Sequence, residues 1–384
     1  MEINIKIRAF LFCCSILFIS YPTRAQQNDK IVYPEFYTFH AGDNSDWAQP
    51  DFDDSDWKQA EIHIFPLEDW QGIGWFRFVF EVDSALWGVA WGLQMQYAGA
   101  AEVYLDGVLL HRFGQVGASK EDERGYHDLL PIPREITFHG FVRTGDGRSR
   151  HVIAVRYSSF LLVSMGSSPR LDFYITDLSR ALSWRDNFRN RVTVHQMFLM
   201  GVFMAFALLH ALLFFYYPKE RANLYYAALS AFQALAVYSW FQFTFTTDPI
   251  YLGFVLSLRD ISLTISMLAA IRLTYLFIYP KRPGIFLYFF FVGIGLTLWS
   301  LVRPFTVGMY AIVFSIVAFL EIVRALAVSG IRKSVVSRYS GKGGWIILLG
   351  MVPMALTGAY WLLEYLDVVP ELLDFFAFPV PFYA

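Results

Sequence analysis

Residues 197–217 read MFLMGVFMAFALLHALLFFYY, and they decide the fold class of this chain. The stretch contains no Asp, Glu, Lys or Arg. At about 1.5 Å of rise per residue, a helix of this length crosses the roughly 30 Å hydrocarbon core of a bilayer. A helix also satisfies its backbone hydrogen bonds internally, as lipid requires. The stretch therefore predicts a transmembrane helix.

Apolar stretches of similar length occupy the rest of the C-terminal half. They predict further complete spans and the start of a last one, at residues 224–243, 261–279, 285–301, 305–328 and 345–366 and from Phe375 onward. We expect residues 196–384 to form an all-α transmembrane bundle of six complete spans and a truncated seventh. The part of the protein that carries an output is then expected beyond Ala384.

The loops between these spans alternate in their content of basic residues. Lys219 and Arg221 follow the first span, Lys281 and Arg282 follow the third, and more Lys and Arg follow the fifth, over residues 332–342. Basic residues concentrate in cytoplasmic loops. The pattern therefore predicts an N-terminus outside the cytoplasm and a C-terminal end inside it.

One group of basic residues opposes this orientation, because it lies just before the first span. Its members are Arg180, Arg185, Arg189 and Arg191. We expect residues 179–195 to form a helical or interfacial juxtamembrane linker, and the export of the N-terminus to fix the orientation first.

Residues 1–25 have the composition of a secretory signal peptide. Lys6 and Arg8 form a basic start, residues 9–20 are apolar but too short to span a bilayer, and Ala25 suits a cleavage site. An uncleaved anchor is the alternative. Cleavage would remove both cysteines, Cys13 and Cys14, so we expect a mature chain without disulfides.

Residues 28–178 predict an all-β domain. Short segments with a period of two are separated by Gly, Pro and Asp clusters, which is typical of a β-sandwich. In residues 75–82, WFRFVFEV, one face of the expected strand carries Phe76, Phe78, Phe80 and Val82. Asp106-Gly107 predicts a tight hairpin turn, since both residues tolerate positive φ.

Aromatic and polar residues of this domain are candidates for ligand binding. Tryptophans can stack on sugar rings, and carboxylates, imidazoles and phenols can bond to hydroxyls. The candidates are Trp75, Arg77, Asp106, His111 and Tyr126. The alternative is that most tryptophans are buried in the core and that Arg77 pairs with a carboxylate inside the domain.

Other chemistries find less support. A net charge of -2 provides no basic field for nucleic acid. We expect no catalytic group, no cofactor and no metal site. An acidic run could in principle bind calcium, but a solvated turn is the more usual structure for such a run, formed here by Asp51, Asp53, Asp54 and Asp56.

Ionisable residues within the predicted spans lie near span ends, where pairing or snorkelling to the interface explains them. Arg259 and Asp260 are adjacent, and Glu321 and Arg324 share one helix face. No chain of acids and bases crosses the midplane, which argues against a proton pump or an ion transporter.

Three segments of the β domain resemble a known pattern. They are PDFDDSDWKQAE at 50–61, GIGWFRFVFEV at 72–82 and AEVYLDGVLLHRFGQVG at 101–117. Together they resemble the galactose-binding-like jelly roll that accompanies glycoside hydrolase catalytic domains. The resemblance implies a jelly-roll sandwich with a carbohydrate as one candidate ligand.

The junction of the first two spans, LLHALLFFYYPKERANLYYAALSAFQAL at 208–235, resembles bacterial seven-transmembrane receptors with diverse intracellular signalling modules. Those proteins join an extracytoplasmic jelly roll to seven helices and a cytoplasmic kinase, cyclase or phosphatase. The resemblance implies a multi-pass protein of the bacterial inner membrane with a periplasmic N-terminal domain.

We therefore expect a sensor whose partners are the lipid bilayer, an extracytoplasmic small ligand and a cytoplasmic signalling module. The sequence predicts no enzyme within these 384 residues. Two alternatives remain open: a membrane-anchored module that binds carbohydrate or protein without signalling, and a membrane enzyme.

Overall fold

The computed structural model describes residues 36–61, 65–138 and 148–331. The predicted signal peptide, the span at 345–366 and the segment from Phe375 lie outside these residues. The strands are β1 (Phe36–Ala41), β2 (Lys58–Glu61), β3 (Ile73–Asp83), β4 (Trp91–Leu105), β5 (Val108–Phe113), β6 (Tyr126–His127), β7 (Arg134–Ile136), β8 (Arg148–Ser158) and β9 (Leu171–Asp177). The helices are η1 (Ser45–Ala48), η2 (Ser84–Leu86), α2 (Leu161–Ser164), α3 (Leu178–Tyr216), α4 (Arg221–Phe245), α5 (Pro249–Ile278), α6 (Ile285–Val302) and α7 (Pro304–Ile331).

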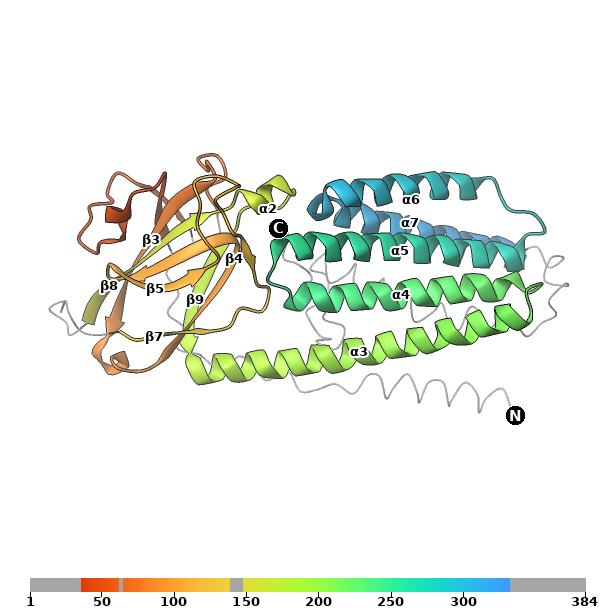
Figure 1. The fold of residues 1–384 in the computed structure, drawn as a ribbon, viewed down its shortest axis with the longest axis horizontal. Helices are drawn as coiled ribbons and strands as arrows, with labels where there is room; N and C mark the ends of the chain where they lie inside the picture. The colour runs from red at the N-terminus through yellow and green to blue at the C-terminus, as the bar shows by residue number, and fades with distance from the viewer. Residues whose placement is uncertain (1–35, 62–64, 139–147, 332–384) are drawn as a thin grey trace. The chain divides into compact units, whose positions relative to one another are not determined.

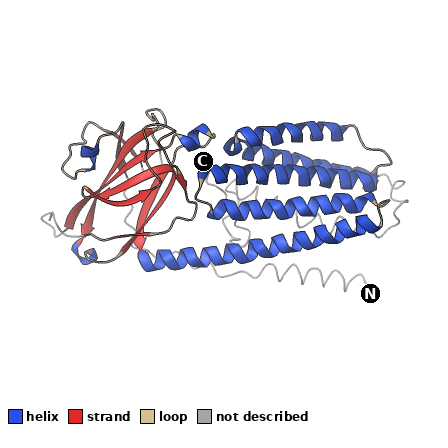
Figure 2. Cartoon of the chain, viewed as in Figure 1, coloured by secondary structure: helices blue, strands red, loops and turns tan. Residues whose placement is uncertain are grey.

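An antiparallel β-sheet region thus precedes a series of long helices (Figures 1 and 2). Its main sheet has the order β2-β1-β3-β8-β4-β5. The long strand β4 belongs to two parts of the sheet: residues 91–97 pair with β9, and residues 100–105 pair with β8. Strand β4 therefore links the two layers between which the core lies.

The core contains the alternating residues predicted for residues 75–82. Phe76, Phe78, Phe80 and Val82 all belong to the main buried cluster, which confirms that they share one face. Phe78 meets Phe173 of β9 edge to face, with 4.3 Å between ring centroids. Aromatic contact across the core therefore joins β3 to β9.

The opposite face of β3 is also buried in its first half. Trp75 is 0% exposed and packs with Ala154 of β8 and Ala48 of η1. The segment that covers them, residues 42–57, follows β1. This second apolar layer positions the candidate site described below.

The predicted hairpin turn is confirmed. Asp106 and Gly107 join β4 to β5 with φ values of 49° and 84°. Positive φ at both positions is the geometry that the right-handed twist of a hairpin favours, and Asp and Gly adopt it at low cost.

Among the residues that the structure describes, four helices are long and apolar enough to cross a membrane: α3, α5, α6 and residues Pro304–Val328 of α7. Helix α4 covers the predicted span 224–243, but it is less apolar, because its sequence includes Asn223, Ser230, Gln233, Ser239, Gln242 and Thr244. Helix α5 packs against α4, α6 and α7, whereas α3 packs against α4. Helix α5 is therefore the central helix of the described bundle.

Helix α3 begins directly where β9 ends. Asp177 is the last residue of β9 and also the N-cap of α3, since its side chain accepts a hydrogen bond from the Arg180 backbone N–H at 2.8 Å. The segment expected to be a linker, residues 179–195, is helical and continuous with the first apolar stretch. No break occurs between sheet and helix at this point.

Candidate ligand-binding site

A pocket of about 360 Å³ opens on the outer face of the main sheet. Its lining comes from the segment after β1 and from strands β3, β4 and β8: Asp43, Ser45, Trp75, Tyr104 and Arg156. Strand register brings these residues together. Arg156 of β8 pairs with Trp75 on one side and with Glu102 of β4 on the other.

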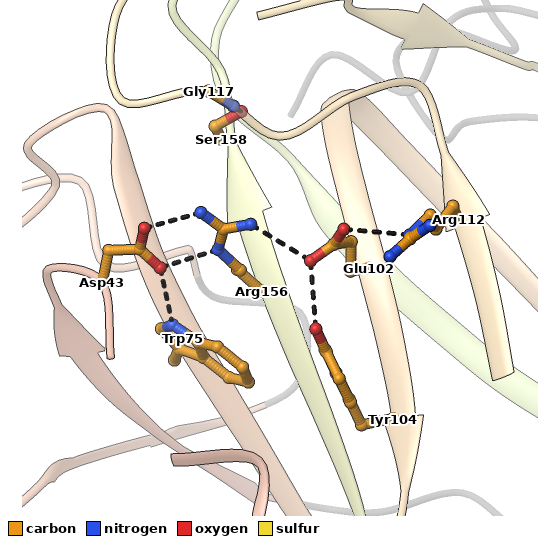
Figure 3. A network of polar contacts seen from close by, with 8 residues as sticks. All are labelled: Asp43, Trp75, Glu102, Tyr104, Arg112, Gly117, Arg156 and Ser158. Carbon is orange, nitrogen blue, oxygen red and sulfur yellow. Dashed lines mark hydrogen bonds and ion pairs between the residues drawn. The ribbon is translucent and has the colours of Figure 1, made fainter. Parts of the chain in front are cut away.

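Arg156 is the centre of a polar network around this pocket (Figure 3). Its Nε and Nη2 donate to the two carboxylate oxygens of Asp43 at 2.7 and 2.6 Å. Its Nη1 donates to Glu102 Oε2 at 3.1 Å. Glu102 also accepts from the Tyr104 hydroxyl at 3.0 Å and from Arg112 Nε at 3.2 Å. Acidic and basic side chains therefore alternate across three strands and the covering segment.

The network fixes the protonation states of its members. Hydrogen bonds from Arg156 hold the pKa of Asp43 below its usual value, although partial burial opposes this. The same hydrogen bonds, with those to Glu102, raise the pKa of Arg156. Burial, followed by the nearby Glu102 carboxylate, raises the pKa of the Tyr104 phenol. At neutral pH the pocket thus presents a carboxylate, a guanidinium and a neutral phenol.

Trp75 lines the pocket, but no face of its ring is free for a ligand. The ring lies 5.4 Å from that of Tyr104 and meets Trp47 edge to face. The indole N–H donates to Asp43 Oδ1 over a long 3.4 Å. Trp75 therefore acts on the pocket by supporting Asp43 and Tyr104, and the predicted stacking of Trp75 on a ligand does not fit its burial.

Arg77 lies under the covering segment and outside the pocket. Its guanidinium donates to Asp54 Oδ2 at 3.0 Å and to three backbone carbonyls, those of Trp47, Gln49 and Phe52. The side chain is only 1% exposed. This is the internal pairing that the sequence left open as the alternative to ligand binding. Arg77 holds in place the segment that carries Asp43.

Asp106, His111 and Tyr126 do not line the pocket. Asp106 accepts from the backbone N–H of Val152 in β8 at 2.9 Å and so ties the β4–β5 turn to β8. His111 Nε2 lies 3.0 Å from the Glu135 carbonyl. The Tyr126 hydroxyl donates to Asp128 at 3.2 Å, and burial raises the pKa of that phenol to about 12. The structure therefore brings only Trp75 of the predicted residues to this pocket.

Asp106 belongs to a hydrogen-bonded series in the order of a nucleophilic triad. Ser149 Oγ lies 2.8 Å from His151 Nε2, and His151 Nδ1 lies 2.7 Å from Asp106 Oδ2. Ser149 is 0% exposed, however, and its Oγ accepts the Trp87 indole N–H at 2.8 Å. A nucleophile must reach its substrate, so this series stabilises the hairpin and offers no accessible nucleophile.

Two aspartates of the acidic run at residues 51–56 form hydrogen bonds within the protein. Asp54 accepts from the Thr38 hydroxyl at 2.6 Å as well as from Arg77. Asp53 accepts from the Ser55 backbone N–H at 3.1 Å. Within residues 36–61, 65–138 and 148–331, no group of three or more His, Cys, Asp or Glu side chains is placed to hold a metal ion.

Sequence reasoning missed five residues of the network: Asp43, Glu102, Tyr104, Arg112 and Arg156. Glu102 and Tyr104 are two apart in a predicted strand, a spacing that places them on one face. Their meeting with Arg156 depends on which strands are neighbours, and strand order cannot be read from local periodicity.

Comparisons with known proteins assign no family. No family model and no curated protein matches the chain. Among solved structures, it is similar to a β-glucuronidase from glycoside hydrolase family 2, with 14% identity, a TM-score of 0.25 and coverage of 35% of this chain. The chain spans 15% of that enzyme chain. At this TM-score the similarity carries no argument about fold or activity.

Proposed function

We propose that this chain is the sensory part of a bacterial inner-membrane receptor. Its β domain, a galactose-binding-like jelly roll on the periplasmic side, binds a small polar ligand such as a carbohydrate. Its helices belong to a seven-helix bundle that relays ligand binding to a cytoplasmic signalling module. The observation that carries the proposal is the direct junction of β9 and α3 at Asp177.

The pocket supports the binding half of this proposal. Small-molecule sites are concave and combine an apolar wall with a few well-placed polar groups. Tyr104 and Ser45 line the pocket together with the Asp43–Arg156 pair. Four hydrogen bonds from Arg77 hold the covering segment against the sheet. A preformed site of this kind loses little conformational entropy when a ligand binds.

The junction supports the relay half. A displacement of β9 reaches α3 without an intervening loop, since Asp177 pairs with Trp91 in the sheet and caps the helix. Gly92 allows close approach there, because a Cβ at this position would lie 3.2 Å from Leu178 Cα. A tether built for attachment alone would not require such a rigid connection.

The membrane orientation rests on loop charge. The α3–α4 and α5–α6 loops carry Lys219 and Lys281 with neighbouring arginines, whereas the α4–α5 loop carries Asp248. Basic loops favour the cytoplasm. This distribution supports a β domain outside the cytoplasm and a signalling module inside it.

The proposal is tested with the full chain in lipid nanodiscs. Spin labels are attached to Tyr216→Cys of α3 and Tyr288→Cys of α6, two exposed positions, after Cys13 and Cys14 are replaced by Ser. A panel of sugars, amino acids and peptides is screened by calorimetry. We expect a ligand that binds to change the distance between the labels.

A matched control separates binding from relay. Insertion of two glycines between Asp177 and Leu178 should preserve ligand affinity and abolish the change in label distance. A ligand that binds tightly and leaves the distance unchanged in the unmodified chain would contradict the relay and favour a membrane-anchored binding module.

A further inference from the structure

The charges around the pocket indicate which ligands it can accept. Asp43, Arg156, Glu102 and Arg112 form a series in which each carboxylate touches at least one guanidinium. Their formal charges are two negative and two positive and sum to zero. An ionised ligand would therefore enter a site whose charges already compensate one another.

An acidic ligand would have to compete with Asp43 for Arg156. Asp43 already holds the guanidinium by two hydrogen bonds of 2.7 and 2.6 Å, the strongest geometry for this pair. Displacement would leave the Asp43 carboxylate without its guanidinium partner. A basic ligand would meet Arg156 at the centre of the network. An acidic or a basic ligand would therefore lose its hydration without finding an unpaired group of opposite charge in the pocket.

A hydroxyl group faces no such conflict. Arg156 uses three N–H groups on Asp43 and Glu102, and a guanidinium has five in all. A ligand hydroxyl can accept a hydrogen bond from one of the remaining N–H groups and donate one to the Asp43 carboxylate. Neighbouring hydroxyls on a ring can repeat this arrangement with the hydroxyl of Ser45, which also lines the pocket.

The apolar part of the pocket suits a small ring. Tyr104 lies over the buried Trp75, with 5.4 Å between their ring centroids, and so provides a supported aromatic surface. A volume of about 360 Å³ is near the lower end of the range for small-molecule sites, roughly 300–1,000 Å³. The pocket therefore fits one ring, or the end of a longer chain.

We propose that the pocket formed by Asp43, Ser45, Tyr104 and Arg156 binds an uncharged saccharide and discriminates against uronic acids and amino sugars. This inference rests on the proposed function, because it names the ligand class and the charge selectivity of the same domain.

The test uses sugars matched in all but one group. Neutral hexoses, the corresponding uronates and the corresponding amino sugars are titrated by calorimetry into the full chain in nanodiscs. We expect at least one neutral hexose to bind tenfold or more tightly than its uronate and its amino sugar. Tighter binding of a uronate or an amino sugar would overturn the charge selectivity, and binding of no sugar would overturn the ligand class.

Substitutions then locate the site. Asp43→Asn and Arg156→Met should each weaken binding of the neutral hexose tenfold or more. Tyr104→Phe keeps the ring and removes only the hydroxyl that bonds to Glu102, the partner of Arg156. It should weaken binding several-fold, and it provides a second test should Arg156→Met not fold. The controls are Asp46→Asn of η1 and Arg150→Met of β8, which lie outside the pocket lining. Unchanged affinity in Asp43→Asn and Tyr104→Phe would overturn the assignment of the pocket.

The label-distance experiment keeps this inference separate from the sensor proposal. If another ligand class changes the distance and no sugar binds, the sensor stands and the saccharide assignment fails. If a neutral hexose binds in the pocket without changing the distance, the saccharide assignment stands and the relay fails.

Discussion

At the scale of single residues, Arg77 fastens the covering segment to the β domain through four hydrogen bonds. Arg77→Met would leave the Asp54 carboxylate and three backbone carbonyls without this donor. We expect a loss of about 3–5 kcal/mol in the free energy of unfolding, as for other broken buried ion pairs. Denaturant titration of tryptophan fluorescence measures it, with Arg150→Met as control. A loss below about 1 kcal/mol would contradict this role.

Because of Asp43, the stability of the β domain should fall as the pH is lowered through the acidic range. Hydrogen bonding to Arg156 lowers its folded-state pKa below the usual value of 3.8. A lowered carboxyl pKa contributes stability above the usual value, and this contribution is lost as the pH falls through the folded value. We therefore expect the difference in melting temperature between the unmodified chain and Asp43→Asn to shrink on acidification. Thermal unfolding across pH measures this, with Asp46→Asn as control, and a difference that grows would refute it.

The residues that sequence reasoning identified correctly are those whose role is local. Asp106 occupies its turn because Asp and Gly tolerate positive φ, a property of the two residues themselves. Trp75 was predicted to stack on a ligand; it lines the pocket, but its burial does not fit that role. The partnership of Asp43 with Arg156 spans 113 positions in sequence, and no local pattern encodes it. The sequence therefore predicted one residue that lines the pocket and missed its polar centre.

At the scale of elements, β4 depends on Gly99 where it passes from one layer to the other. Gly99 has a φ of 153°, and a Cβ there would lie 2.0 Å from the Ser158 carbonyl oxygen. We expect Gly99→Ala to destabilise the β domain by more than the roughly 1–2 kcal/mol of a strained φ alone. Gly88→Ala is the control, since Gly88 has a φ of 70° and no atom within 4 Å of a built Cβ. Equal losses in the two variants, measured by denaturant titration, would remove the steric argument.

A polar contact joins α5 to α7 inside the bundle. The Tyr275 hydroxyl donates to Glu321 Oε1, and Arg324 Nε donates to Glu321 Oε2 at 2.6 Å. Tyr275→Phe should lower stability by about 0.5–1.5 kcal/mol, the usual contribution of a hydrogen bond between membrane helices. Thermal unfolding in detergent measures the change. Tyr279→Phe serves as control, and an equal effect there would show that the loss is not specific to the bond between Tyr275 and Glu321.

Sequence reasoning predicted helices better than it predicted their boundaries. Composition identified the apolar stretches of α3, α5, α6 and α7, because twenty apolar residues are readily recognised. It could not show that residues 179–195 continue α3, since a polar helix and an interfacial linker have similar compositions. The alternating strands were likewise clear, whereas the division of β4 between two layers depends on tertiary contacts that periodicity does not report.

At the scale of the whole molecule, the orientation can be tested directly. A reporter enzyme that is active only outside the cytoplasm is fused after Asp248, in the α4–α5 loop, or after Lys281, in the α5–α6 loop. Because Lys and Arg favour the cytoplasmic side, we expect activity from the first fusion and none from the second. The opposite result would reverse the orientation, and activity from both would show that α5 does not cross the membrane.

The double role of Asp177 restricts how the junction between the β domain and α3 can change in evolution. An α-helix turns by about 100° per residue, so each residue gained or lost between β9 and α3 rotates α3 about its own axis. The pairing of Asp177 with Trp91 fixes where that rotation starts. The junction thus sets the angular phase of α3, and with it the side of the helix that meets α4. If another domain replaced the β domain, α3 would keep this rotation only if the last strand of the new domain ended with its final side chain on the same face of the sheet as Asp177 of β9.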